Sequence, residues 1–135
     1  MEKSHCFQFV RCNDNLCRTG TFTPIIIDDS SSDIGRYTGI QVGTDGLPIM
    51  MYVDETNGWM KVAHCSSKDC SGAVTKTIVD EIGISAYGEF PELQINPLTG
   101  LAVLSYFNQT NHTSGIKQSL FCISLLANVT IIKVL

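Results

Sequence analysis

The sequence predicts an all-β protein built from a repeat of about 53 residues. Three observations predict this class. Short runs rich in Val, Ile, Thr, Tyr and Phe alternate with Gly, Asp, Asn and Pro, which is typical of strands joined by turns. The pairs Cys12-x4-Cys17 and Cys65-x4-Cys70 recur at an offset of 53 residues. Ile40-Gln-Val42 recurs as Leu93-Gln-Ile95 at the same offset.

The clearest copy of the pattern is Gly35–Cys70, where Asp45-Gly46 and Asn57-Gly58 separate three apolar runs. Both dipeptides are strong signals for a hairpin turn. Carried along the chain, the pattern gives ten expected strands and no convincing helix. The strands are Cys6–Cys12, Thr21–Asp28, Tyr37–Val42, Leu47–Val53, Trp59–Cys65, Ala73–Asp80, Phe90–Asn96, Leu101–Phe107, Ile116–Cys122 and Val129–Leu135.

The chain is expected to form a single repeat domain over residues 1–135. Unit 1 covers about 5–58, unit 2 about 59–115 and a partial unit 3 about 116–135. Four short strands per unit is the size of a propeller blade, so the chain holds about two and a half blades. A closed propeller usually needs four to eight blades. We therefore expect oligomerisation to complete the structure, as a ring or a filament. A fragment of a longer repeat protein and a ten-stranded β-sandwich are the alternatives.

The pattern also resembles a known repeat. Tyr37-Thr-x-Ile40, Asp45-Gly-Leu-Pro48 and Lys61-Val-Ala-His-Cys65-x4-Cys70 are similar to the tandem repeat of large secreted bacterial proteins, mostly of unknown function. The resemblance covers 35–70 well and the rest of the chain more weakly. It implies a propeller-like fold and a surface context, and it supplies no catalytic residues.

Composition excludes several partners. Apolar residues make up 44% of the chain, charged residues 16%, and the formal net charge is −4 without any basic run. Nucleic acid binding is therefore not expected, because neutralising phosphates needs clustered Lys and Arg. The sequence contains no apolar run of about 18 residues, so no membrane span is predicted. The N-terminus lacks the apolar core of a signal peptide. The cysteines and glycosylation motifs nevertheless favour an extracellular or cell-surface protein over a cytoplasmic one.

Each Cys-x4-Cys pair is expected to form a local disulfide that closes the loop after the first strand of its unit. The pairs are Cys12–Cys17 and Cys65–Cys70. Cys6 and Cys122 are left over, because Ala127 stands where Cys122 would find its loop partner. They either bridge to each other, within one chain or between neighbours, or remain buried free thiols.

Zinc is the alternative for the paired cysteines, because Cys-x4-Cys spacing also occurs in zinc sites. The candidate ligand sets are His5 with Cys6, Cys12 and Cys17, and His64 with Cys65 and Cys70. Neither set has a second pair at finger-like distance, and duplication of the cysteine pair favours a structural role. No cofactor is expected.

Three Asn-x-Thr sequences predict N-linked glycans at Asn108, Asn111 and Asn128. The first two lie in the longest expected turn, over residues 108–115. That turn replaces the tight Asp54–Gly58 turn of the previous unit and is three residues longer. Chance occurrence is the alternative, and the clustering of Asn108 and Asn111 in one expanded loop favours those two sites.

No catalytic constellation is found, so the protein is not expected to be an enzyme. The acidic pairs Asp28-Asp29 and Asp80-Glu81 recur after equivalent strands, which favours turn-forming and solvation roles over calcium binding or glycoside hydrolysis. The Asp54–Gly58 loop lacks the acidic spacing of a calcium loop. Aromatic residues could line a sugar-binding face, although the recurrence of Tyr52 as Tyr106 favours packing. These aromatic residues are Tyr37, Tyr52, Trp59, Tyr87 and Tyr106.

The sequence thus favours a non-enzymatic extracellular structural protein that assembles with itself through incomplete blades, decorated by glycans. A carbohydrate-binding, lectin-like module is the alternative, and a glycoside hydrolase is the third possibility.

Overall fold

The computed structural model describes residues 5–18, 23–31, 33–83, 92–107, 118–123 and 132–134. All ten expected strands are present, with boundaries shifted by a few residues. They are β1 (Phe7–Phe9), β2 (Ile25–Asp28), β3 (Ile34–Val42), β4 (Pro48–Asp54), β5 (Trp59–Cys65), β6 (Val74–Glu81), β7 (Glu92–Ile95), β8 (Ala102–Phe107), β9 (Gln118–Ile123) and β10 (Ile132–Val134). The described residues contain no helix, and hence none with the length and apolar character that crossing a bilayer requires.

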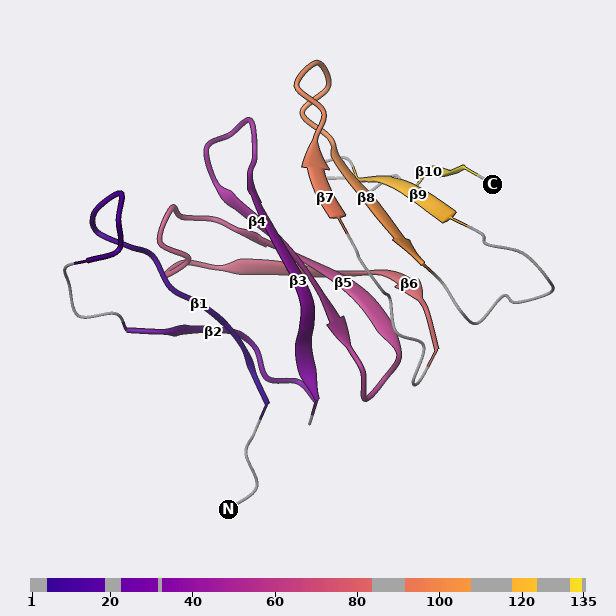
Figure 1. Ribbon diagram of the computed structural model, residues 1–135, viewed down its shortest axis with the longest axis horizontal. Helices are drawn as coiled ribbons and strands as arrows, with labels where there is room; N and C mark the ends of the chain where they lie inside the picture. The colour runs from indigo at the N-terminus through magenta and orange to yellow at the C-terminus, as the bar shows by residue number, and fades with distance from the viewer. Residues whose placement is uncertain are drawn as a thin grey trace.

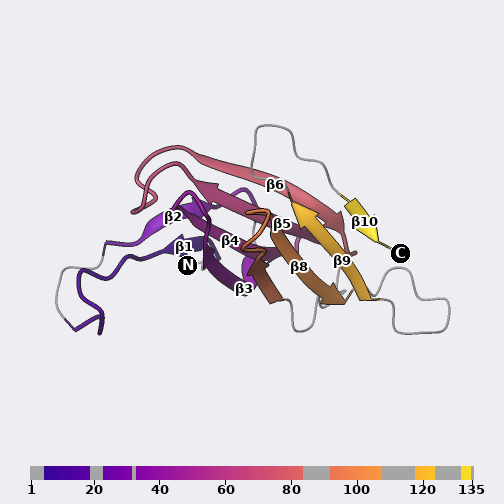
Figure 2. The same ribbon diagram turned by 90° about the horizontal axis from the view of Figure 1, so that it is seen from above.

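The strands form three antiparallel sheets. The N-terminal sheet pairs β1 with β2, the central sheet has the order β3-β4-β5-β6, and the C-terminal sheet has the order β7-β8-β9-β10. Figure 1 shows the three sheets following one another in chain order, and the view from above in Figure 2 shows the same succession. The described strands do not close into a ring.

The sheets group the strands differently from the repeat units. A sheet ends after β2 and again after β6, two strands away from the unit boundaries expected near residues 58 and 115. Each four-stranded sheet therefore combines strands of two successive units. Consequently the incomplete, two-stranded sheet lies at the N-terminal side, whereas the sequence pattern placed the incomplete unit at the C-terminal side.

The two hairpin turns form as their sequences predict. Gly46 and Gly58 adopt φ values of +77° and +68°, which glycine reaches without a steric penalty. In the first turn the Leu47 N–H donates to Asp45 Oδ1 at 3.0 Å, as is usual for Asp at this position. The turns set the antiparallel registers of β3 with β4 and of β4 with β5.

The central sheet is covered on both faces. Every residue of β4 is buried, which explains its continuous apolar run. Ile49, Met51 and Val53 pack towards the C-terminal sheet, whereas Met50 and Tyr52 pack towards the N-terminal sheet. A two-sheet sandwich would bury only one face of each sheet.

The repeat is preserved in the packing. Phe7 and Phe9 pack on the central sheet, as Met60 and Val62, 53 residues later, pack against the C-terminal sheet. The β1–β2 pair has a register shift after Phe7, and the β5–β6 pair has one after the equivalent Met60. The N-terminal sheet therefore corresponds to β5 and β6, the second half of a four-stranded sheet.

Candidate functional site

Both predicted local disulfides are present, Cys12–Cys17 and Cys65–Cys70. The two loops end alike: Cys17 and Cys70 adopt φ values of 51° and 56°, and the N–H of each donates to the carbonyl three residues earlier. Disulfide bonding uses both sulfur atoms of each pair, so these cysteines cannot serve as the thiolates that zinc requires. Among the described residues, no three His, Cys, Asp or Glu side chains converge as metal ligands.

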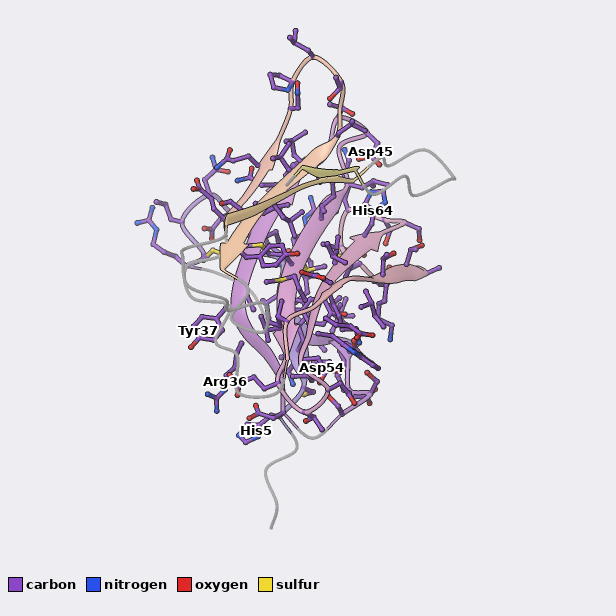
Figure 3. The ribbon with its side chains drawn as sticks, turned by 90° about the vertical axis from the view of Figure 1, so that its right-hand side faces the viewer. His5, Arg36, Tyr37, Asp45, Asp54 and His64 are labelled. Atoms are coloured by element: carbon purple, nitrogen blue, oxygen red, sulfur yellow. A yellow bond between two sulfur atoms is a disulfide. The ribbon has the colours of Figure 1, made fainter. Side chains whose placement is uncertain are left out.

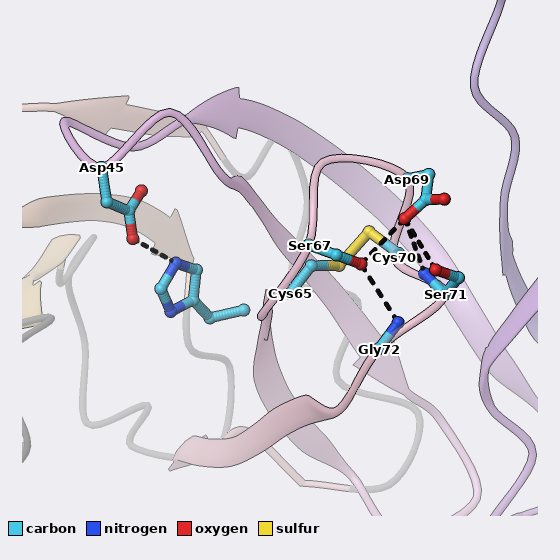
Figure 4. Close-up of a disulfide and its surroundings, with 8 residues drawn as sticks. Asp45, Cys65, Ser67, Asp69, Cys70, Ser71 and Gly72 are labelled. Atoms are coloured by element: carbon cyan, nitrogen blue, oxygen red, sulfur yellow. Dashed lines mark hydrogen bonds and ion pairs between the residues drawn. A yellow bond between two sulfur atoms is a disulfide. The ribbon is translucent and has the colours of Figure 1, made fainter.

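Side chains within the second loop hold it in shape (Figure 4). The Ser67 and Ser71 hydroxyls each donate to Asp69 Oδ1 at 2.8 Å, and the Gly72 N–H donates to Ser67 Oγ. The hydrogen bonds from Ser67 and Ser71 lower the pKa of Asp69 to about 2, because they favour its ionised form. The disulfide and the hydrogen bonds among Ser67, Asp69, Ser71 and Gly72 together fix the conformation of this loop.

The two unpaired cysteines remain apart from these loops. Cys6 is a half-buried free thiol whose sulfur accepts a hydrogen bond from Gln8 Nε2 at 2.9 Å, so it forms no bridge to Cys122 within the chain. Only the backbone of Cys122 is described, within β9. A bridge between neighbouring chains stays a prediction.

A buried polar cluster joins the N-terminal sheet to the central sheet. Asp28, at the end of β2, accepts hydrogen bonds from Tyr52 Oη on β4 at 2.7 Å and from Lys61 Nζ on β5 at 2.5 Å. Lys61 is only 6% exposed, and its Nζ also lies 3.3 Å from Ser30 Oγ and 3.9 Å from Asp54 Oδ2. The cluster therefore places one buried cation between two buried carboxylates.

The surroundings keep Asp28 ionised and Tyr52 protonated near neutral pH. Burial alone would raise the pKa of Asp28, but hydrogen bonds from Lys61, Tyr52 and Ser30 outweigh it and hold that pKa well below its ordinary value. Burial, together with the bond to the Asp28 carboxylate, raises the pKa of Tyr52 well above its ordinary value. Tyr52 therefore stays a hydrogen-bond donor, and neither Tyr52 nor Asp28 is poised for proton transfer near neutral pH.

The same tyrosine–aspartate contact recurs between the next two sheets. Tyr106 Oη on β8 donates to Asp80 Oδ2 on β6 at 2.7 Å. Each sheet is thus joined to the next by an Asp–Tyr hydrogen bond. Lys61 is not repeated, because β9 places Ser119 opposite Tyr106 where β5 places Lys61 opposite Tyr52.

This cluster changes two expectations from the sequence. Asp28 is not a solvated turn residue, since its side chain is fully buried. Nothing in the sequence around Lys61 indicates its buried role. The recurrence of Asp28 and Tyr52 as Asp80 and Tyr106 is the signal that points to a contact shared by successive repeat units. The packing role expected for both tyrosines is confirmed, because both rings are buried.

The remaining candidate residues form no enclosed polar site. His64 Nε2 lies 2.9 Å from Asp45 Oδ2 at one end of the central sheet, within ion-pair distance, although it makes no hydrogen bond of good geometry (Figure 3). Asp54 is fully buried and accepts hydrogen bonds from Asn57 in its own loop and from Ser31 before β3, so both of its carboxylate oxygens have protein partners.

The aromatic residues do not share one exposed face. Tyr52 and Tyr106 are buried between sheets, and Trp59 is half-buried on β5. Tyr37, on β3, has a φ of 50°. Its side chain projects outward, as Figure 3 shows. Tyr87 lies outside the described residues. The described aromatic side chains therefore do not gather on a common face that could bind a sugar.

Strand β3 carries exposed apolar side chains at positions whose equivalents in the next repeat unit pack in the core. Ile40 is 54% exposed and Val42 is 65% exposed. Thr38, Ile40 and Val42 alternate with Gly39, whose Cβ position would lie 3.6 Å from Leu93 Cβ of the C-terminal sheet. These three residues, named here the open face, therefore point to the opposite side, towards the N-terminal sheet.

The residue equivalent to Ile40 in the next repeat unit is covered by a neighbouring sheet. Leu93, 53 residues later, is 3% exposed because β3 and β4 of the central sheet cover it. Ile95, the equivalent of Val42, packs against the same core. Among the described residues, β1 and β2 are the strands that precede the central sheet, and they leave the open face uncovered.

The three predicted glycosylation sites, Asn108, Asn111 and Asn128, lie outside the described residues. No protein-family model, curated protein or solved structure matches this chain. Its function is therefore argued from the geometry above.

Proposed function

We propose that this protein is a non-enzymatic, extracellular structural protein that assembles with itself through incomplete propeller-like blades. In this proposal the four-stranded sheets are the blades, and the two-stranded N-terminal sheet is half of one. Association into a ring or a filament covers the surfaces that the half blade leaves open. N-linked glycans at Asn108, Asn111 and Asn128 would decorate the assembly.

One observation carries the proposal: Ile40 is 54% exposed, whereas its repeat equivalent Leu93 is 3% exposed. The same residue position is thus covered in one sheet and uncovered in another. Val42 extends the uncovered apolar surface along β3. Contiguous apolar surface of this kind marks protein contact sites. The free edges of β1 and β3 add backbone groups that can pair with another strand.

Two further observations support the remaining parts of the proposal. Two disulfides fit an oxidising, extracellular environment. The buried cluster of charges around Asp28 and Lys61 leaves no room for a substrate, because its groups are buried and hydrogen-bonded to one another. Its role in the proposal is to hold the half blade against the first complete blade.

Sedimentation velocity across a range of micromolar concentrations tests the proposal. We expect the wild-type chain to sediment as species larger than the monomer, with a distribution that shifts with concentration. Ile40→Lys should weaken association at least tenfold, because it places a charge in the contact and removes its apolar side chain.

Leu98→Lys is the matched control, since Leu98 is 94% exposed in the β7–β8 turn and away from the open face. It should associate like the wild type. A wild-type chain that stays monomeric throughout would contradict self-assembly, and equal effects of the two lysine substitutions would remove the open face from it.

A further inference from the structure

We propose that the free edge of β1, together with the open face of β3, is a docking site for a two-stranded β-hairpin of the same repeat type, supplied by a partner chain. This inference rests on the proposed function, in which uncovered surfaces of the half blade are contact sites. It adds what fits this surface: a pair of strands that completes the half blade to four.

The first step is the position of β1 in the repeat. β1 and β2 correspond to β5 and β6, and they share the register shift and the disulfide loop of that pair. In the central sheet, β5 pairs with β6 on one side and with β4 on the other. Within the described part of the chain, β1 pairs only with β2. The side of β1 that matches the β4 side of β5 is therefore open to a further strand.

The second step is the space beside this edge. A groove of about 250 Å³ runs along β1, lined by Phe7, Gln8, Phe9 and Val10 of that segment and by Thr38, Gly39, Ile40 and Met50 of the central sheet. The groove thus has β1 as its wall and the open face as its floor. A strand paired with β1 would lie in it. Just before β1, His5 already forms an isolated bridge with Asp33, which limits where the added strand can begin.

The third step is the chemistry of the occupant. The packing of the central sheet against the C-terminal sheet shows which residues fit such a surface. There, Leu93 is covered by Gly39 on β3 and by the side of the central sheet that carries Met51. A Cβ on Gly39 would lie 2.7 Å from Met51 Cε, so a small residue on the first strand lets the methionine reach across it. We therefore expect a hairpin with a small residue on its outer strand and an apolar, flexible residue on the strand next to β1.

The chain itself contains a hairpin with this pattern, residues 34–54, which serves as the probe. A fluorescently labelled peptide of this sequence is titrated with the full-length wild-type chain, and binding is read by anisotropy. In the docked position, Met51 would face Ile40 and Met50 would face away. We expect the wild-type peptide and its Met50→Lys variant to bind within about threefold of each other. Met51→Lys should bind at least tenfold more weakly, because it buries a charge against the open face.

Substitutions in the chain test the same surface from the other side. Ile40→Lys should weaken binding of the wild-type peptide at least tenfold, and Leu98→Lys should leave it unchanged. If Ile40→Lys disturbs folding, as judged by circular dichroism, Thr38→Lys takes its place, because Thr38 is already exposed. Failure of the wild-type peptide to bind, or equal weakening by Met50→Lys and Met51→Lys, would overturn the inference.

The two proposals fail separately in these experiments. A chain that sediments as a monomer but binds the hairpin selectively keeps the docking site and loses self-assembly. A chain that associates, yet neither binds the hairpin nor is dissociated by an excess of it, keeps self-assembly and loses the docking site.

Discussion

Replacing Lys61 by methionine tests how the two-stranded N-terminal sheet is held against the central sheet. The substitution keeps most of the side-chain volume and removes the ammonium group that lies between Asp28 and Asp54. Asp28, fully buried, then loses its closest cation. Breaking a buried ion pair by removing one partner typically costs about 3–5 kcal/mol. Lys76 Nζ at 3.5 Å and the Tyr52 hydroxyl at 2.7 Å remain, so we expect the lower end, about 3 kcal/mol.

The assay is urea unfolding followed by the fluorescence of Trp59, the single tryptophan of the chain. The free energy of unfolding comes from the midpoint and slope of the transition. Lys76→Met is the matched control, because Lys76 contacts the same aspartate but its side chain is 40% exposed. It should cost less than about 1 kcal/mol, as exposed ion pairs usually do.

A double-mutant cycle measures the interaction free energy between Asp28 and Lys61 apart from their contacts with other residues. Once Asp28→Asn has removed the buried charge, adding Lys61→Met should cost at least about 1 kcal/mol less than in the wild type, because contacting groups are coupled. The reasoning would be refuted if Lys61→Met cost no more than Lys76→Met. Additive effects of Asp28→Asn and Lys61→Met would refute it equally.

Two further predictions concern the loops and the response to acid. Replacing both Cys65 and Cys70 by alanine should lower the free energy of unfolding by about 2 kcal/mol or more, from the closure of a short loop plus the loss of buried sulfur, as measured by urea unfolding. Replacing Cys12 and Cys17, which are not buried, should cost less, and the reverse order would contradict the packing. The lowered pKa of Asp28 contributes stability that is fully present above about pH 4, its range when unfolded, and is lost as pH falls towards its folded value. Acid titration monitored by fluorescence should therefore show unfolding of Lys61→Met at higher pH than the wild type, and an unchanged midpoint would contradict the role of Lys61.

Local features were predictable from the sequence because their causes are local. Asp45-Gly46 and Asn57-Gly58 specify tight turns whatever surrounds them, so the hairpins of the central sheet followed directly. The recurrence of Cys-x4-Cys made the two loop disulfides predictable. Strand positions followed from runs of β-branched and aromatic residues bounded by turn residues.

Features that depend on which sheets lie next to each other were not predictable. A repeat read along the chain has no fixed starting point, so it could not show that sheets begin at β3 and β7. Lys61 looks like an exposed strand residue, and its closest carboxylate, Asp28, comes from β2 in a different sheet. Ile40 and Leu93 occupy the same repeat position, and their difference in exposure arises only from the strands that cover one of them.

The role of the open face is tested most directly by backbone amide hydrogen exchange of the wild-type chain at dilute and at associating concentrations. If β1 and the open face together form the contact site, the amides of Phe7–Phe9 and Thr38–Val42 will exchange more slowly at high concentration. Those of β6, at the other edge of the central sheet, will be unchanged. Exchange at Phe7–Phe9 and Thr38–Val42 that does not depend on concentration would contradict assembly through this surface.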